Sequence, residues 1–126
     1  MTKLRLIAAV LLALPLIGFG GGYLAGAVPP LEDGTQAGID LLVAMREGGL
    51  MTWVSISHVV VGVLLLVPRT RFASALLQLP ISLGMVALHA TMLPEGLAPA
   101  AVILVLNLAV LADADKLGEL LSAKRA

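Results

Sequence analysis

The stretch FASALLQLPISLGMVALHATM, residues 72–92, decides the fold. It is long enough to cross the roughly 30 Å hydrocarbon layer of a bilayer as a helix, because each residue adds about 1.5 Å. Its polar and polarisable residues recur at helical spacings of four, three and four, and they are Gln78, Ser82, Met85 and His89. One face of the predicted helix is therefore polar, and this face must turn toward other helices rather than toward lipid.

The composition of the whole chain predicts an integral membrane protein. Hydrophobic residues make up 60% and charged residues 13%, and the mean hydropathy is +1.05. Soluble proteins average about 45–50% apolar and about 25% charged residues. The absence of cysteine excludes disulfides and thiolate metal sites in this chain. Eight basic residues balance eight acidic ones, so no excess of positive charge indicates nucleic-acid binding.

Prolines and polar turns divide the chain into four apolar segments. We expect membrane spans at about residues 5–27, 50–67, 72–92 and 98–113, in one domain that covers residues 1–126. A further short amphipathic helix is expected at about residues 36–47, in the first outer loop. We interpret it as a connecting element that rests on the membrane surface, in preference to a lid over a site. The predicted fold class is an all-α, four-helix membrane bundle.

The first segment also has the layout of a secretory signal peptide, with Lys3 and Arg5 before an apolar run and a small-residue motif at residues 25–27. We expect a retained span instead, since the chain that follows is itself hydrophobic. Gly18, Gly22 and Gly26 recur every four residues and clear one face of this helix for the close approach of a neighbour. A neighbour within the same bundle is preferred to a dimer interface.

Basic residues occur at alternate ends of the predicted spans, and they are Lys3, Arg5, Arg69, Arg71, Lys116, Lys124 and Arg125. The two remaining connections are acidic and contain only one basic residue, Arg46. The positive-inside rule therefore places both termini in the cytoplasm of a multi-pass protein, most simply in a bacterial inner membrane. Asp113 and Asp115 are expected at this interface, neutralised by Arg69, Arg71 and Lys116, in preference to a role as a proton pathway.

Polar residues on different spans define a candidate binding pocket. In the second span Ser55 and His58 share a small, polar face, and the fourth span contains Asn107. His58 and Asn107 lie about 13 Å below the outer surface and His89 about 5 Å below it, at roughly 1.5 Å per residue. We expect one outward-facing pocket. The candidate ligand-binding residues are His58, His89, Asn107, Ser55, Ser82, Gln78, Met85 and Trp53.

The third and fourth segments, QLPISLGMVALHATMLPEGLAPAAVILVLNLAVLADADKLGELL, resemble the DoxX-like family of small membrane proteins, as does GVLLLVPRTRFASALL before them. The most distinctive matching positions are Pro80, His89, Pro94, Gly96 and Leu97. Family proteins often carry acidic residues where this chain has His58 and Asn107, so acid chemistry is not transferred to it. The resemblance implies a four-helix membrane fold, similar to the small membrane subunit of a thiosulfate:quinone oxidoreductase.

These observations lead us to expect an accessory or structural subunit of a membrane complex, with a redox complex as one option, rather than a free-standing enzyme. Its expected partners are the bilayer and either another membrane protein or a second copy. The alternative is an oxidoreductase component that binds a quinone-like molecule or a lipid through His58 and His89. The polar residues could instead serve helix packing, at about 0.5–1.5 kcal/mol for each hydrogen bond. Haem is disfavoured because the histidines differ by roughly 8 Å in depth, and no metal site is predicted.

Overall fold

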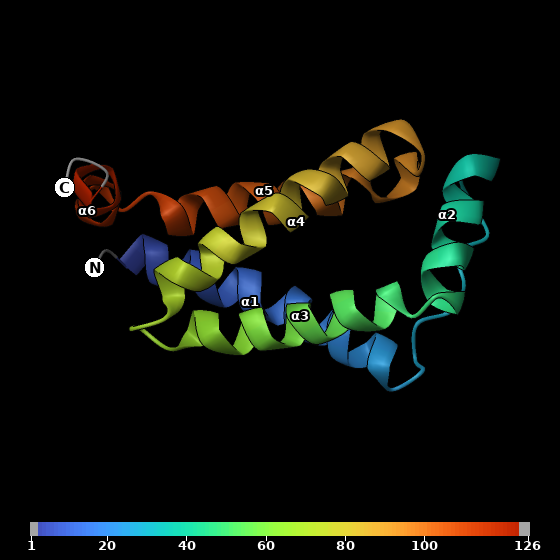
Figure 1. Ribbon diagram of the computed structural model, residues 1–126, viewed down its shortest axis with the longest axis horizontal. Helices are drawn as coiled ribbons and strands as arrows, with labels where there is room; N and C mark the ends of the chain where they lie inside the picture. Colours follow the sequence, from blue (N-terminus) through green and yellow to red (C-terminus); the bar gives the residue numbers. More distant parts are fainter. Residues whose placement is uncertain (1–2, 124–126) are drawn as a thin grey trace.

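The structure, a computed structural model, describes residues 3–123, and in this part of the chain every regular element is a helix. The all-α class is therefore confirmed. In chain order (Figure 1) the elements are α1 (Lys3–Leu24), α2 (Gln36–Glu47), α3 (Leu50–Leu66), α4 (Arg71–Thr91), the short 3-10 helix η1 (Pro94–Gly96), α5 (Leu97–Leu111) and α6 (Ala114–Ala123). Lys124 and Arg125 of the predicted basic tail lie outside the described residues.

Four of these helices pack into a bundle. The most extensive contacts join α1 to α3 and α4 to α5, and the pairs α1–α5 and α3–α4 complete the ring. Figure 1 shows α2 lying across one end of this bundle, while α6 lies at the opposite end together with both termini. The two short helices therefore mark the two ends of the bundle.

Several helices are long and apolar enough to cross a membrane. They are α1, α4 and the continuous segment Pro94–Leu111, which joins η1 to α5. A fourth candidate exists if α2 and α3, which meet at a bend of 80°, count as one broken span. Side chains on the outside of the bundle are also apolar, with Leu14 at 62%, Leu77 at 66% and Val105 at 64% exposure. Such an exterior is compatible with an integral membrane protein.

The bundle is packed most densely in the half that contains the termini. The buried core of that half consists of Ala8, Ala9, Leu12, Ala13, Leu16, Val61, Leu65, Ala75, Val110 and Leu111. Small residues on α1 bring its backbone close to α3. A Cβ on Gly20 would lie 2.6 Å from the carbonyl oxygen of Ser55, and one on Gly62 would lie 3.2 Å from that of Ala13. At Gly20 any side chain would force the two backbones apart, whereas at Gly62 a Cβ would first press on the side chain of Ile17, at 2.5 Å.

The sequence predicted that Gly18, Gly22 and Gly26 pack against a neighbouring helix of the bundle, and that prediction is wrong. Gly18 is exposed, and nothing lies within 4 Å of the position its Cβ would take. Gly22 approaches only the side chain of Val28, and Gly26 lies beyond the end of α1 with a φ of 75°. The first helix does approach α3 closely, but through the face that Gly20 marks and not through the face of the four-residue repeat.

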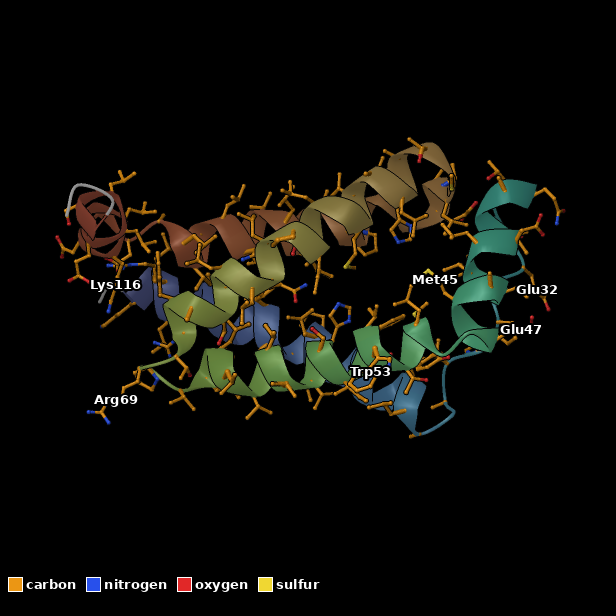
Figure 2. The ribbon with its side chains drawn as sticks, in the orientation of Figure 1. Glu32, Met45, Glu47, Trp53, Arg69 and Lys116 are labelled. Carbon is orange, nitrogen blue, oxygen red and sulfur yellow. The ribbon has the colours of Figure 1, made fainter. Side chains whose placement is uncertain are left out.

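Most basic residues lie at one end of the bundle, together with the acidic residues Asp113, Asp115 and Glu119, whereas the other end is mainly acidic. Figure 2 shows Arg69 and Lys116 at the end that holds the termini, and Glu32 and Glu47 at the end that α2 crosses. At the first end Arg5 of α1 forms an ion pair with Asp113, in the link between α5 and α6. The prediction named Arg69, Arg71 and Lys116 for this role and missed Arg5, which is the ion-pair partner of Asp113. The turn arginine Arg71 instead donates from Nε to the carbonyl oxygen of Leu65, at 2.8 Å.

The junction between α5 and α6 gives a pH-dependent prediction. Oδ1 of Asp113 accepts a hydrogen bond from the backbone N–H of Lys116, at 3.2 Å. This bond, and after it the nearby Arg5, lowers the pKa of the Asp113 carboxyl below its ordinary value of 3.8. A depressed pKa stabilises the folded junction above pH 3.8, and this contribution is lost as the pH falls through the lower, folded-state pKa.

We therefore expect hydrogen exchange at the Lys116 amide to be slow and unchanged from neutral pH down to about pH 5, once corrected for the intrinsic rate, and to accelerate only below the ordinary carboxyl range. The variant Asp113→Asn should exchange faster at neutral pH and lose the acid transition. An acid transition that persists in this variant would assign the effect to another group.

Candidate functional site

A cavity of about 450 Å³ occupies the half of the bundle nearest α2. All four bundle helices contribute to its wall, including Phe19 of α1 and Ile103 of α5, and α2 contributes Leu42, Met45 and Arg46. Figure 2 shows Met45 pointing from α2 toward the bundle. The volume lies within the range of about 300–1,000 Å³ that small-molecule sites occupy. The lining is almost entirely apolar, so its few polar side chains determine what it can bind.

His58 is the most deeply buried of these polar side chains. Its exposure is 3%, and neither of its ring nitrogens has a hydrogen-bond partner among residues 3–123. The close approach of α1 at Gly20 confines its Cβ, and the ring of Phe19 meets the imidazole edge to face at 6.5 Å between centroids. A buried polar group without a partner destabilises a fold by about 1–3 kcal/mol. The wall of the cavity therefore holds an imidazole whose hydrogen-bonding capacity the protein leaves unused.

His89 lines the same cavity, but it is partly tied to the backbone. Its Nδ1 lies 3.0 Å from the carbonyl oxygen of Leu93. Because a carbonyl can only accept, Nδ1 carries the proton, and Nε2 of the neutral ring is an acceptor. A Cβ on Gly96 would collide with this ring, so glycine is needed for the turn at η1 to pack against it. The two histidines therefore share one cavity, together with Met85.

The remaining polar residues of the predicted site lie outside the cavity wall. The amide of Asn107 donates to the carbonyl oxygen of Ala75 at 2.8 Å and accepts from the hydroxyl of Ser82 at 2.9 Å. Ser82 in turn lies 3.4 Å from Nε2 of Gln78. These contacts join α5 to α4 in the packed half of the bundle. Ser55 is also fully buried, and its hydroxyl has no hydrogen-bond partner in the described residues.

Trp53 does not line the cavity, and its prediction as a pocket residue is wrong. It is 71% exposed, and Figure 2 shows it on the outer side of α3. A helix advances about 100° per residue, so the neighbouring Val54 faces the cavity when Trp53 faces outward. The prediction placed Trp53 in the pocket because it lies near the end of the span. Whether a residue lines the cavity also depends on the direction of its side chain.

The helix α2 forms part of the cavity wall, so the expectation of a plain connecting element is wrong in this respect. Its N-cap residue Thr35 donates from both its backbone nitrogen and its hydroxyl to the carbonyl oxygen of Met92, each at 3.0 Å. Gly38 packs against the same corner, where a Cβ would lie 2.8 Å from that oxygen. These contacts hold α2 against the end of α4 and close one side of the cavity.

The hydrogen bonds of Asn107 give a stability prediction. Replacing Asn107 with alanine removes the acceptor of the buried Ser82 hydroxyl and a side-chain donor to the carbonyl oxygen of Ala75. We expect unfolding in a mild detergent to require about 1 kcal/mol less free energy, with up to about 2 lost if neither contact is replaced. Because Asn107 lies outside the cavity wall, ligand affinity should not change. Unchanged stability together with lost affinity would place Asn107 in the site.

No metal site is apparent in the part of the chain that the structure describes, since no three His, Asp or Glu side chains group there as ligands. The comparisons give no relative either: the chain matches no protein-family model, no curated protein and no solved structure. The resemblance to the DoxX-like family therefore stays a prediction, and the cavity is the feature that indicates a function.

Proposed function

We propose that this chain is a multi-pass membrane protein that binds a lipid-soluble molecule in the cavity and holds the polar head of that molecule at His58. One observation carries the proposal. The imidazole is 97% buried in an apolar wall, and within the described part of the chain both of its nitrogens lack a hydrogen-bond partner. A bound head that hydrogen-bonds to it would remove the penalty of about 1–3 kcal/mol that the unliganded fold bears.

The surroundings of His58 favour an apolar ligand with few polar atoms. Apart from the two histidines, Tyr23 and Arg46, every lining residue presents aliphatic, aromatic, thioether or backbone atoms. Apolar walls favour an apolar body, while a few placed polar groups fix its orientation. A quinone-like head suits this arrangement, because a ring carbonyl accepts from an imidazole N–H and the reduced hydroxyl donates to an imidazole nitrogen. His89 offers a second polar contact in the same cavity.

The distribution of basic residues supports an orientation for the protein in its membrane. The end with Arg69 and Lys116 holds most of the basic residues, and the end with Glu32 and Glu47 is mainly acidic. Under the positive-inside rule the termini face the cytoplasm, and α2 and the cavity face the outer side. In this orientation α2 and α6 rest at the two surfaces of a bacterial inner membrane. A role as a binding subunit of a larger membrane complex is compatible with this arrangement.

Native mass spectrometry of the detergent-extracted protein tests the proposal. Wild type should retain a small molecule, and His58→Leu should release it, because the leucine offers no hydrogen bond. The matched control is Trp53→Leu, which also replaces a ring by leucine but lies on the outer surface of α3. Retention of the molecule by His58→Leu would overturn the proposal. A bound partner protein without any small molecule would favour the accessory-subunit role instead.

A further inference from the structure

We infer that the ligand carries an anionic group, a carboxylate or phosphate on an apolar chain, and that Arg46 binds this group. The inference rests on the proposed function and names the charge of the ligand. It starts from Arg46, which among residues 3–123 is the one arginine or lysine of the cavity wall.

The surroundings of Arg46 leave its charge uncompensated. Among residues 3–123 no carboxylate lies within ion-pair distance of its guanidinium group. Its Nη2 atom donates to two backbone oxygens, those of Pro29 at 3.1 Å and Val28 at 3.4 Å. Its Nε and Nη1 atoms have no hydrogen-bond partner in the same part of the chain, although a guanidinium group has five N–H donors.

These contacts also fix the position of the guanidinium group. It lies over the ring of Tyr23, with 5.1 Å between Cζ and the ring centroid. Stacking on an aromatic face and two carbonyl contacts hold the side chain against the segment between α1 and α2. A fixed guanidinium fork with unused N–H groups matches the two oxygens of a carboxylate or phosphate. In an apolar wall such a charge-assisted pair is screened less than it would be in water.

The acidic residues at this end of the molecule do not neutralise the charge of Arg46. Glu32, Asp33, Asp40, Glu47 and Glu95 belong to the same end, but Arg46 forms an ion pair with none of them. Charges that face water are screened over about 10 Å at ordinary salt.

Calorimetric titration in a neutral detergent tests this inference. The probes are decanoate, decyl phosphate and the uncharged 1-decanol, added at about pH 8, where a carboxylic acid is ionised. We expect wild type to bind at least one of the anions about ten-fold or more tightly than the alcohol. The preferred anion then distinguishes a fatty acid from a phosphorylated lipid. Detergent partitioning cancels when variants are compared at one detergent concentration.

The decisive variant is Arg46→Gln, which removes the charge and keeps an N–H donor for the carbonyl oxygens of Val28 and Pro29. It should bind 1-decanol as wild type does and lose the preference for the anion. Arg46→Lys, which keeps the charge, should retain a preference for the anion.

Three results would overturn the inference while leaving the proposed function intact. They are equal binding of anion and alcohol by wild type, a preference that survives in Arg46→Gln, and equal loss of anion and alcohol in that variant. The last result would make Arg46 a structural link alone. Binding of none of the three probes by wild type would count against the inference and the proposed function together.

Discussion

Replacing Gly20 with valine is expected to destabilise the bundle by about 3 kcal/mol, the upper end of the range for overpacking. The added Cβ would lie 2.6 Å from the carbonyl oxygen of Ser55 and 3.1 Å from the side chains of His58 and Val59. A flexible side chain could move aside, but a helix backbone cannot, so α1 and α3 must separate along their contact. The measurement is the free energy of unfolding in a mild detergent.

The matched control is Gly18→Val, two residues away on the same helix. Nothing lies within 4 Å of its added Cβ, and the residue is exposed. We expect its unfolding free energy to stay within about 0.5 kcal/mol of wild type, as at other exposed positions. Equal losses in both variants would mean that α1 does not present the face of Gly20 to α3. A loss of unfolding free energy confined to Gly18→Val would mean that α1 packs through the face that the glycine repeat predicts.

Replacing His58 with leucine is expected to have opposite effects on stability and on binding. In protein stripped of lipid, the variant should unfold with equal difficulty or up to about 2 kcal/mol more, because it removes a buried polar group that has no partner among residues 3–123. Less of the lipid-soluble ligand should be retained, because leucine cannot make the hydrogen bonds that the imidazole of His58 offers. The two measurements are unfolding in detergent and ligand retention on extraction.

A histidine that served only to pack the helices would behave differently. Its removal would lower stability and leave retention unchanged, as expected for Asn107, whose amide joins α4 to α5. The comparison of His58→Leu with Asn107→Ala therefore separates the two roles of the buried polar residues, which are ligand binding and helix packing. A His58→Leu variant that is less stable and still retains its ligand would contradict the assignment of the cavity.

The helices follow from the sequence because an apolar segment of span length has few alternatives to a helix. The polar face predicted on residues 72–92 is likewise present: Gln78 and Ser82 are fully buried, while Met85 and His89 line the cavity. Helical spacing determines which residues share a face. It does not determine whether a given residue lies in the packed half of the bundle or in the half that contains the cavity. That position decides whether a polar side chain packs against another helix or lines the cavity.

Other parts of the site depend on contacts that no local pattern encodes. Arg46 was recognised only as an exception to the charge pattern, since its place in the wall depends on how α2 folds back onto the bundle. Phe19 and Tyr23 stand four residues apart on α1, which is a signal for one shared face, and both line the cavity. The position of α2 rests on Thr35 and Met92, whose separation along the chain hides the contact from a sequence analysis.

Photolabelling of the membrane-embedded protein tests the central claim most directly. A neutral lipid probe with a diazirine on its chain and a quinone-like head would be activated in vesicles, and the labelled positions mapped by mass spectrometry. We predict labels on Phe19, Met45 and Met85 of the cavity wall, reduced by His58→Leu but not by Trp53→Leu. Labels confined to positions on the outside of the bundle such as Leu77 and Val105, equal in all three proteins, would contradict a ligand site in the cavity.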